Sequence, residues 1–571
     1  MENFITIRRP SLRTVALILL IGAVAAPPPT AVACTTLLVG KKASADGSVL
    51  MATSCDSGSM GLVKVVPAQT FEPGTKRKLY FDFPAPASWQ EQAALAKRGF
   101  TQVGQIEVDR TYRCVLAAGH FADSVTGGIN EHGVSMGIEW MGMKKALVSK
   151  LGKVSTCSSH SSSSLIANGL MRAKTAREAI GLMGAMVEEY GFTYYWSPSA
   201  GCAIPVVDKN EAWIMEIFGP GADWKPESGR PGAVWCAQRV PDGEVTCNAN
   251  RSRIGRIDLE DRQNFLGSAN IHSLARELGL WKPGAPFVWH EVYGVTGSRG
   301  NSLREWAALS LVAPSLGLQA TGDPAKDRYP FSVKPDQGVD VAKLAAIMRD
   351  TYEGTPFDVT QCEEFRTAKG KLNPMARAVG DRRLFDTVGV KPERCIATGT
   401  SGYVYISQIR DWLPDSIAGC MWFTLGPSYT SCFAPIYSGV TELPPSWSRS
   451  PDFTRVDRSQ AQWKFQLVED LTGLRYQEAI QDVQKVYEPA EAQFLALQPT
   501  MEAYAKKLHR EQGAAAAQQF VTAYSNQCLR NVDEAYGKLV DHLTFKYLYS
   551  YSADSPAQSP KVKTPSIPKP E

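Results

Sequence analysis

The sequence predicts an α+β protein in which layered strands and helices are followed by a helical C-terminal region. Three observations predict this fold class. Short apolar runs separated by Gly, Asp and Asn fill residues 34 to about 250, helical periodicity interrupts them, and nearly continuous helical periodicity extends from 459 to 548. With 571 residues, 44% of them hydrophobic, the chain has enough apolar material for a large core.

Strands are predicted where apolar runs are bounded by turn residues. Asp46-Gly47 separates the first two runs and is typical of a hairpin turn, because glycine tolerates positive φ. Two further tight turns are expected at 130–133 and 208–211. The predicted strands are 35–40, 48–52, 62–66, 134–140, 202–207, 212–218, 234–238, 403–409 and 419–425.

Helical spacing of apolar residues predicts the helices. Within 165–190, Thr175 with Glu178 is typical of a capping box, which predicts two helices with a break near Ala173. Another helix is expected at 341–352. These patterns divide the chain into a domain at 34–450, a helical region packed on it at 451–550, and a disordered Pro-rich tail at 551–571.

Residues 1–33 have the pattern of a signal peptide. Three arginines (Arg8, Arg9 and Arg13) precede an apolar run at 15–26, and Ala31-Val32-Ala33 places small residues at the −3 and −1 positions of a cleavage site. The apolar run is shorter than the roughly 20 residues of a transmembrane helix. We therefore expect an exported protein, periplasmic or extracellular, without a stable membrane span after cleavage. An uncleaved anchor and a lipoprotein acylated on Cys34 are the alternatives.

Cleavage after Ala33 makes Cys34 the first residue of the mature chain. An N-terminal cysteine carries a thiol nucleophile together with an α-amine whose reference pKa is near 8, so the amine serves as the local base. Asp56 ends the hairpin that follows and is the candidate acid that orients this amine. Asn248 and Asn250 offer amide donors for an oxyanion, and Glu139 is a lone carboxylate in an apolar strand.

Other chemistries find less support in the sequence. A papain-like mechanism needs a distant histidine, but His120, His132 and His290 lie in segments without a supporting motif. The formal charge of +4 is spread along the chain, which disfavours nucleic acid as a partner. None of the 12 cysteines forms a Cys-x-x-Cys pair, so a structural zinc site is not indicated. No metal or organic cofactor is expected, and the disulfide pairing stays open.

Several motifs then resemble one known family. The stretch CTTLLVGKKASADGS at 34–48 resembles the N-terminal motif of the bacterial dipeptidase A and secernin family, which are cysteine-type N-terminal nucleophile hydrolases. The likeness extends over roughly residues 34 to 545. The remaining motifs are GINEHGV at 128–134, NEAW at 210–213, AQRVPD at 237–242, ANRSRI at 249–254, MRDTYEGTPF at 348–357, QIRDWLP at 408–414 and FAPIY at 433–437.

The resemblance implies a four-layer αββα sandwich and hydrolysis of dipeptides or short peptides. It implies Cys34 as nucleophile, Asp56 as the aspartate behind it, and Asn250 as the oxyanion or orienting amide, with Asn248 as a close rival. It also favours Glu139, together with Arg253 from the ANRSRI motif, as a substrate-binding residue.

One position departs from the family pattern. Family members commonly carry arginine three residues before the aspartate, where this chain has Thr53. Arg239, Arg253 and Arg410 are candidate substitutes that spacing alone does not place. We therefore expect an exported cysteine dipeptidase that acts through a thioester. Hydrolysis of another acyl-amide bond, or a non-catalytic secernin-like protein or lipoprotein, is the alternative, and a homo-oligomer stays open.

Overall fold

The computed structural model describes residues 34–56, 61–80, 102–119, 125–148, 162–193, 199–380, 382–450 and 454–548. The described residues belong to one compact unit. Within the described ranges, every helix is too short or too polar to cross a lipid bilayer. The predicted signal peptide at 1–33 and the predicted tail at 551–571 lie outside the described residues.

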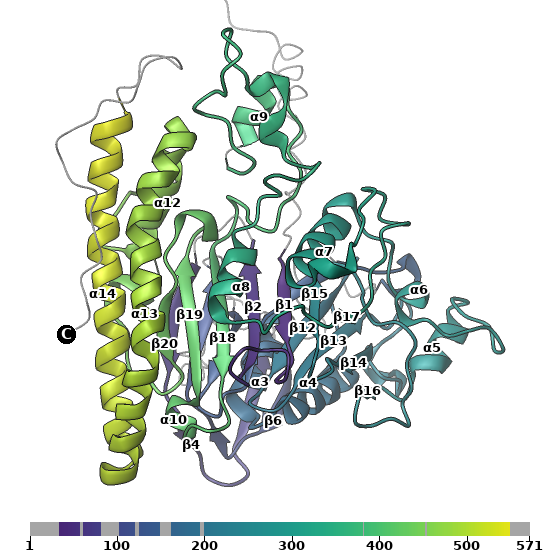
Figure 1. Ribbon diagram of the computed structural model, residues 1–571. Coiled ribbons are helices and arrows are strands. Elements are labelled where there is room, and N and C mark those ends of the chain that lie inside the picture. Colours follow the sequence, from purple (N-terminus) through teal and green to yellow (C-terminus); the bar gives the residue numbers. More distant parts are fainter. Residues whose placement is uncertain are drawn as a thin grey trace, which may run out of the picture. The chain divides into compact units, whose positions relative to one another are not determined.

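The described strands form two large antiparallel sheets and two small ones (Figure 1). The first large sheet has the order β17-β15-β1-β2-β18-β19-β20, so the N-terminal strand lies near its middle. Its strands are β1 (Thr36–Val39), β2 (Val49–Cys55), β15 (Val245–Asn248), β17 (Ser332–Val333), β18 (Tyr403–Ile409), β19 (Gly419–Leu425) and β20 (Ala434–Tyr437).

The second large sheet has the order β16-β14-β13-β12-β10-β9-β8-β3, with β11 also paired to β12. Its strands are β3 (Gly61–Val66), β8 (Cys114–Gly119), β9 (Val125–Asn130), β10 (Ser135–Met136), β11 (Glu139–Gly142), β12 (Ala200–Val207), β13 (Ala212–Phe218), β14 (Val234–Arg239) and β16 (Phe265–Gly267). The small sheets pair β4 (Gln69–Thr70) with β7 (Arg110–Thr111) and β5 (Lys76–Tyr80) with β6 (Gln102–Glu107).

Helices pack against both large sheets. Helices α3 and α4 contact the second sheet, whereas α8, α12 and α14 contact the first, and α7 lies against β15. Figure 1 shows α12, α13 and α14 beside β19 and β20. The helices are α3 (Ser162–Arg172), α4 (Ala176–Tyr190), α5 (Ile271–Glu277), α6 (Trp289–Val292), α7 (Arg299–Val312), α8 (Val341–Met348), α9 (Arg382–Val388), α10 (Asp415–Ala418), α11 (Pro445–Ser448), α12 (Ala461–Thr472), α13 (Tyr476–Gln512) and α14 (Ala514–Tyr547).

Side-chain hydroxyls connect the two sheets face to face. The Tyr405 hydroxyl donates to the Met136 carbonyl oxygen and accepts the Gly128 amide at 3.1 Å. The hydroxyl oxygens of Ser135 and Ser407 lie 2.7 Å apart. Because a buried hydroxyl without a partner is costly, these bonds fix the position of one sheet against the other.

The α+β class agrees with the sequence prediction, and most predicted elements are present. The segment at 165–190 forms α3 and α4, and the Thr175 side chain caps α4 by accepting the Glu178 amide at 3.2 Å. The segment predicted as one strand at 134–140 is instead divided into β10 and β11 around Gly137. A side chain at Gly137 would meet Thr53 of the first sheet, so tight packing between the sheets accounts for this glycine.

Candidate active site

Cys34 lies just before β1 and is almost completely buried, with 4% of its surface exposed. Its carbonyl oxygen accepts a 2.6 Å hydrogen bond from Nη1 of Arg304. The next residue is tied to β2 by two hydrogen bonds, because the Thr35 amide donates to the Ser54 hydroxyl at 3.0 Å and the Ser54 amide donates to the Thr35 carbonyl at 3.1 Å. The predicted nucleophile therefore lies at the end of a strand whose backbone is tied to β2 through Ser54 and to α7 through Arg304.

Strand register determines what faces the Cys34 thiol. Thr36 lies opposite Thr53 on β2 and opposite Asn248 on β15. Continuing the β1–β2 register places Cys34 opposite Cys55, and side chains two residues apart share a face of the sheet. The thiol therefore lies on the same face as Thr36 and Asn248, the face that packs against the second sheet.

The surroundings of Cys34 raise the pKa of its thiol, which keeps the thiol protonated at neutral pH. A hydrogen bond with the Cys55 thiol raises the pKa of Cys34 most strongly, and burial and the negative charge of Asp56 raise it further. A backbone hydrogen bond from Asp56 to the sulfur has the opposite effect and favours the thiolate. Asp56 thus acts on Cys34 through both its backbone amide and its carboxylate.

The Asp56 carboxylate is buried and fully engaged. Its Oδ2 accepts the Ser54 hydroxyl at 3.0 Å and forms an ion pair with Nη2 of Arg394, while its Oδ1 accepts the Ser401 hydroxyl at 2.5 Å. Only 1% of the Asp56 side chain is exposed, compared with 25% of Arg394. Three donors, one from the neighbouring Ser54 and two from the distant segment 394–401, therefore fix this carboxylate beside the nucleophile.

Arg304 is a site residue that the sequence analysis missed. From α7, its Nη1 donates to the Cys34 carbonyl and to the Thr35 hydroxyl, and its Nη2 donates to Oδ1 of Asn250 at 3.0 Å and to the Ala249 carbonyl at 3.2 Å. Burial, with Arg394 nearby, lowers the pKa of Arg304 to about 10, so it remains cationic at neutral pH. A signal was present: an arginine at helical spacing before Ala307 and Ala308 interrupts an apolar face.

The two asparagines differ in which side-chain atoms are available. Asn250 has a left-handed backbone with φ 67°, and its Nδ2 already donates to the Trp140 carbonyl at 2.9 Å. Its backbone amide donates to Oδ1 of Asn248 at 3.0 Å. The Nδ2 of Asn248 is buried without a hydrogen-bond partner. Among the described amides near Cys34, the Asn248 amide thus retains a donor for a further acceptor.

Glu139 lies beside this asparagine loop, completely buried between the sheets. Its Oε2 accepts the Asn250 amide at 3.1 Å, while its Oε1 has no hydrogen-bond partner. Burial raises the pKa of Glu139 to about 8, against the smaller opposing effects of the Thr36 hydroxyl, the Asn250 amide and the charge of Arg304. The structure therefore brings Glu139 together with Asn250 and Arg304.

Thr53 occupies a position with no room for a long side chain. Its hydroxyl oxygen lies 2.9 Å from that of Thr36, and a Cβ added to Gly137 would approach it to 3.0 Å. Arg394 supplies the ion pair to Asp56 from another segment. None of the three substitutes suggested by the sequence does so within the described residues. Arg239 pairs with Glu211 and Asp242, Arg253 with Glu305, and Arg410 with Glu502.

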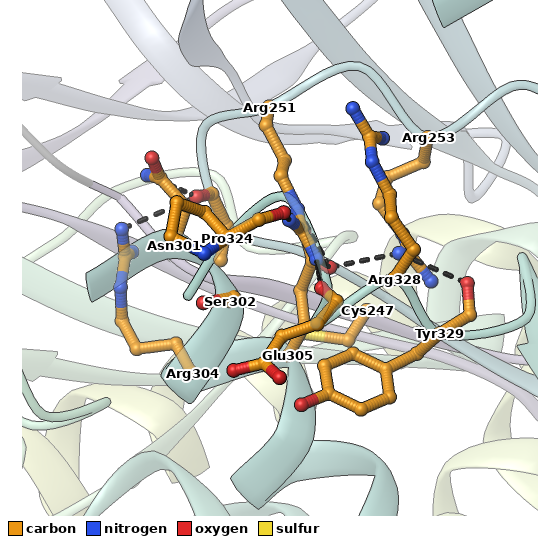
Figure 2. Close-up of polar contacts among 12 residues, drawn as sticks. Cys247, Arg251, Arg253, Asn301, Ser302, Arg304, Glu305, Pro324, Arg328 and Tyr329 are labelled. Carbon is orange, nitrogen blue, oxygen red and sulfur yellow. Dashed lines mark hydrogen bonds and ion pairs between the residues drawn. The ribbon is translucent and has the colours of Figure 1, made fainter. Parts of the chain in front are cut away.

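Arg253 belongs to a separate buried ion cluster. Its Nη1 donates to Glu305 at 2.7 Å, and Nε of Arg251 donates to the same carboxylate at 2.8 Å. Figure 2 shows Arg304 and Asn301 on one side of this cluster and Arg253 on the other. Glu305 follows Arg304 in α7, so the cluster anchors the helix that delivers Arg304 to Cys34. The described contacts of Arg253 support a scaffolding role.

Among the histidines considered for a papain-like mechanism, His132 is engaged with an aspartate. His132 places its Nδ1 3.0 Å from Oδ2 of Asp415. Burial, together with Arg328, lowers the pKa of His290 to about 4. His120 lies outside the described residues. Within the described ranges no group of acidic, His and Cys side chains is arranged to hold a metal ion, and no disulfide links the cysteines.

Comparison with known proteins identifies the family. Residues 33–489 match peptidase family C69 along most of the chain. The chain belongs to peptidase family C69. The matched region begins one residue before Cys34 and includes every residue of the site described above, so the resemblance to dipeptidase A is confirmed.

Curated relatives of the chain carry dipeptidase names. Dipeptidase A of Lactobacillus helveticus is 25% identical over 425 residues, which cover 74% of this chain and 78% of the relative. A probable dipeptidase of Salmonella dublin is 23% identical, covering 74% of this chain and 84% of the relative. A dipeptidase of Bifidobacterium longum is 24% identical over 72% of each chain.

Proposed function

We propose that this family C69 peptidase is an exported dipeptidase whose nucleophile is the N-terminal thiol of mature Cys34. One observation supports this proposal most strongly. Cys34 is buried, directly follows a signal-type cleavage site, and lies beside Asp56, Arg304 and the unpartnered amide of Asn248. The dipeptidase names of the relatives support the substrate class. Contacts of helices with both sheets support the four-layer αββα arrangement of N-terminal nucleophile hydrolases.

The proposed reaction begins when the α-amine released by cleavage after Ala33 takes the thiol proton of Cys34. The thiolate attacks the carbonyl carbon of the peptide bond and forms a tetrahedral intermediate. The ammonium then returns a proton to the leaving amine, and a thioester remains on Cys34. Water, deprotonated by the same amine, hydrolyses the thioester and restores the free thiol. Asp56 orients the amine and stabilises its charged form.

Oxyanion stabilisation is assigned to Asn248 in this proposal. Its Nδ2 is buried without a partner and shares a sheet face with Cys34, whereas the Nδ2 of Asn250 is committed to Trp140. A preorganised amide donor in a buried site stabilises a developing oxyanion strongly. Asn250, expected from the family resemblance to supply this amide, is better suited by its contacts to link Arg304 with Glu139.

Arg304 and Glu139 have supporting roles. Arg304 clamps the backbone of the nucleophile through the Cys34 carbonyl, which keeps the N-terminal residue in one orientation. Glu139 offers the unpartnered Oε1 to the ammonium group of a bound dipeptide. A charged ammonium near this carboxylate favours its ionised form, so substrate binding and ionisation of Glu139 support each other.

Two measurements test the proposal. Mass spectrometry of the exported protein is expected to give Cys34 as the first residue, and a different start or a diacylglyceryl group on Cys34 would contradict the mechanism. The mature protein, Cys34→Ser and Cys34→Ala are then assayed against a dipeptide panel. We expect both variants to lose turnover while keeping the wild-type melting temperature. Peptidase activity in Cys34→Ala would place the nucleophile elsewhere.

A further inference from the structure

A cavity of about 570 Å³ lies within the segment 378–398, on the Arg394 side of Asp56. Its apolar lining includes Phe385 and Val390. Its charged lining consists of two acidic and two basic residues, Asp386, Glu393, Lys391 and Arg394. In Figure 1, α9 of this segment lies beyond the ends of β1 and β2. The volume is within the usual range for small-ligand sites and exceeds what a single amino acid needs.

A short chain of contacts connects this cavity to the nucleophile. The backbone of Asp56 hydrogen-bonds to the Cys34 sulfur, the Asp56 carboxylate forms an ion pair with Arg394, and Arg394 lines the cavity. Arg394 is 25% exposed although its partner carboxylate is almost completely buried. The guanidinium therefore extends from the catalytic aspartate to the cavity wall.

The backbone of Arg394 is held in place from two sides. Its carbonyl oxygen accepts the Tyr352 hydroxyl at 2.7 Å, and Gly300 of α7 packs against its Cβ, since a side chain at Gly300 would approach that atom to 2.7 Å. The neighbouring Glu393 is also engaged, because Arg299 donates to its carboxylate at 2.7 Å. The acidic neighbour of Arg394 is thus neutralised by a different arginine.

The chemistry of a dipeptide fits this placement. In a dipeptide the free carboxylate is three covalent bonds from the scissile carbonyl carbon, a distance of roughly 4 Å, and each added residue moves it about 3.5 Å further away. A cation that selects dipeptides must therefore lie close to the nucleophile. Arginine suits this task because its planar guanidinium binds a carboxylate with two parallel hydrogen bonds.

We propose that Arg394 is a specificity-determining residue that binds the C-terminal carboxylate of the substrate, and that the cavity at 378–398 accepts the side chain beside that carboxylate. This inference rests on the proposed dipeptidase function and names the group that restricts the substrate to short peptides with a free C-terminus. The Nη1 of Arg394 already donates to the carbonyl oxygens of Cys395 and Ile396, and its Nη2 pairs with Asp56. In this proposal the substrate carboxylate is a further partner, bound at the mouth of the site.

The kinetic test compares a dipeptide with the same dipeptide carrying a C-terminal amide. It uses exported protein whose first residue is confirmed as Cys34. We expect the wild type to prefer the free acid, and Arg394→Gln to raise KM for the acid by about 10- to 100-fold, the usual loss for a hydrogen bond to a charged group. KM for the amide should change little, so the ratio of the KM values of amide and free acid should approach one. Arg394→Lys should recover part of it.

An equal loss of kcat on both substrates, with the preference unchanged, would overturn the inference and leave Arg394 as a residue that only positions Asp56. Arg458→Gln is the matched control, since Arg458 also pairs with an aspartate, Asp541, but is 45% exposed in a different region. This control should keep the wild-type preference.

Equilibrium binding separates this inference from the proposed function. Titration of Cys34→Ala with the dipeptide and its amide should show tighter binding of the acid, and Arg394→Gln in the same background should abolish that difference. Binding that ignores the carboxylate would overturn the role of Arg394 even if Cys34 is the nucleophile. A nucleophile other than Cys34 would contradict the proposed mechanism but leave this binding difference intact.

Discussion

Cys34, just before β1, and Cys55, the last residue of β2, lie opposite each other when the β1–β2 register is continued by two residues, and a hydrogen bond joins their thiols. The backbone bond from Ser54 to Thr35 belongs to the adjacent pair of residues, so Cys34 and Cys55 form a non-hydrogen-bonded pair. In such pairs the Cα atoms are only about 4.5 Å apart and the side chains are closest. The predicted nucleophile therefore has a second thiol as its nearest cross-strand neighbour.

This neighbour should make Cys34 a weaker acid. Because the hydrogen bond with Cys55 is the largest effect raising the pKa of Cys34, Cys55→Ala should lower that pKa. The rate of Cys34 alkylation by iodoacetamide, followed by peptide mass spectrometry across a pH series, is then expected to reach its plateau at lower pH in the variant. An identical pH profile in both proteins would mean that burial alone controls the thiol.

The same pair should form a disulfide under oxidation. Disulfides span Cα separations of 4.4–6.8 Å, which includes the usual spacing of a non-hydrogen-bonded pair. Treatment with diamide, which takes up the two hydrogens lost by the thiols, should join Cys34 to Cys55 and stop turnover, and dithiothreitol should restore it. Cys55→Ala should resist this inactivation. Mapping that finds Cys34 joined to a different cysteine would contradict the register argument.

The sequence predicted local elements well because their signals are local. Ala212–Phe218 is an apolar run interrupted only by Glu216, and it forms β13 with the expected bounds. Thr175 is the N-cap of α4, as its capping box predicts. The sequence did not predict the division between β10 and β11, because Gly137 is required by its close packing against Thr53 on the facing sheet. A contact between two sheets does not change the alternation of apolar and polar residues in either strand, so the sequence pattern does not reveal it.

The same limit applies to the site. The place of Asp56 behind Cys34 follows from one hairpin and was predictable. Arg304 and Arg394 reach the site from 270 and 338 residues along the chain, and no spacing rule joins them to Cys34 or Asp56. The three arginines that the sequence suggested in place of one at Thr53, namely Arg239, Arg253 and Arg410, make their contacts elsewhere.

Glu139 should make the stability of the fold depend on pH. Its pKa rises to about 8 when buried, so between about pH 4.5 and 8 the folded chain holds a proton that the unfolded chain releases. The stabilisation from Glu139 is therefore greatest below the pKa that this group has in the unfolded chain. It is lost as the pH rises through the higher pKa of the folded chain. Glu139→Gln keeps an acceptor for the Asn250 amide but removes the titration.

Denaturant unfolding of wild type and Glu139→Gln at pH 5 and pH 9 measures this effect. Relative to the variant, the free energy of unfolding of the wild type should fall by roughly 3–5 kcal/mol between pH 5 and pH 9, at about 1.4 kcal/mol per pKa unit. Titrations elsewhere in the chain cancel in the difference between the two proteins. A difference that does not change with pH would show that Glu139 is ionised throughout, with an ordinary pKa.

The last prediction separates the two asparagines by their backbone and their free atoms. Asn248→Ala removes the unpartnered Nδ2 and should lower kcat by about 100- to 1,000-fold with little change in KM, as expected for loss of an oxyanion donor. Asn250→Gly keeps the left-handed backbone at φ 67° and the hydrogen bond from the backbone amide to Glu139. It loses the side-chain hydrogen bonds to Arg304 and Trp140.

We therefore expect Asn250→Gly to lower the melting temperature and to affect kcat less than Asn248→Ala does. Steady-state kinetics and thermal unfolding of both variants give the comparison. If Asn250→Gly instead loses more kcat at an unchanged melting temperature, Asn250 is the oxyanion donor, as the family resemblance implied, and its bond to Trp140 must open when the substrate binds.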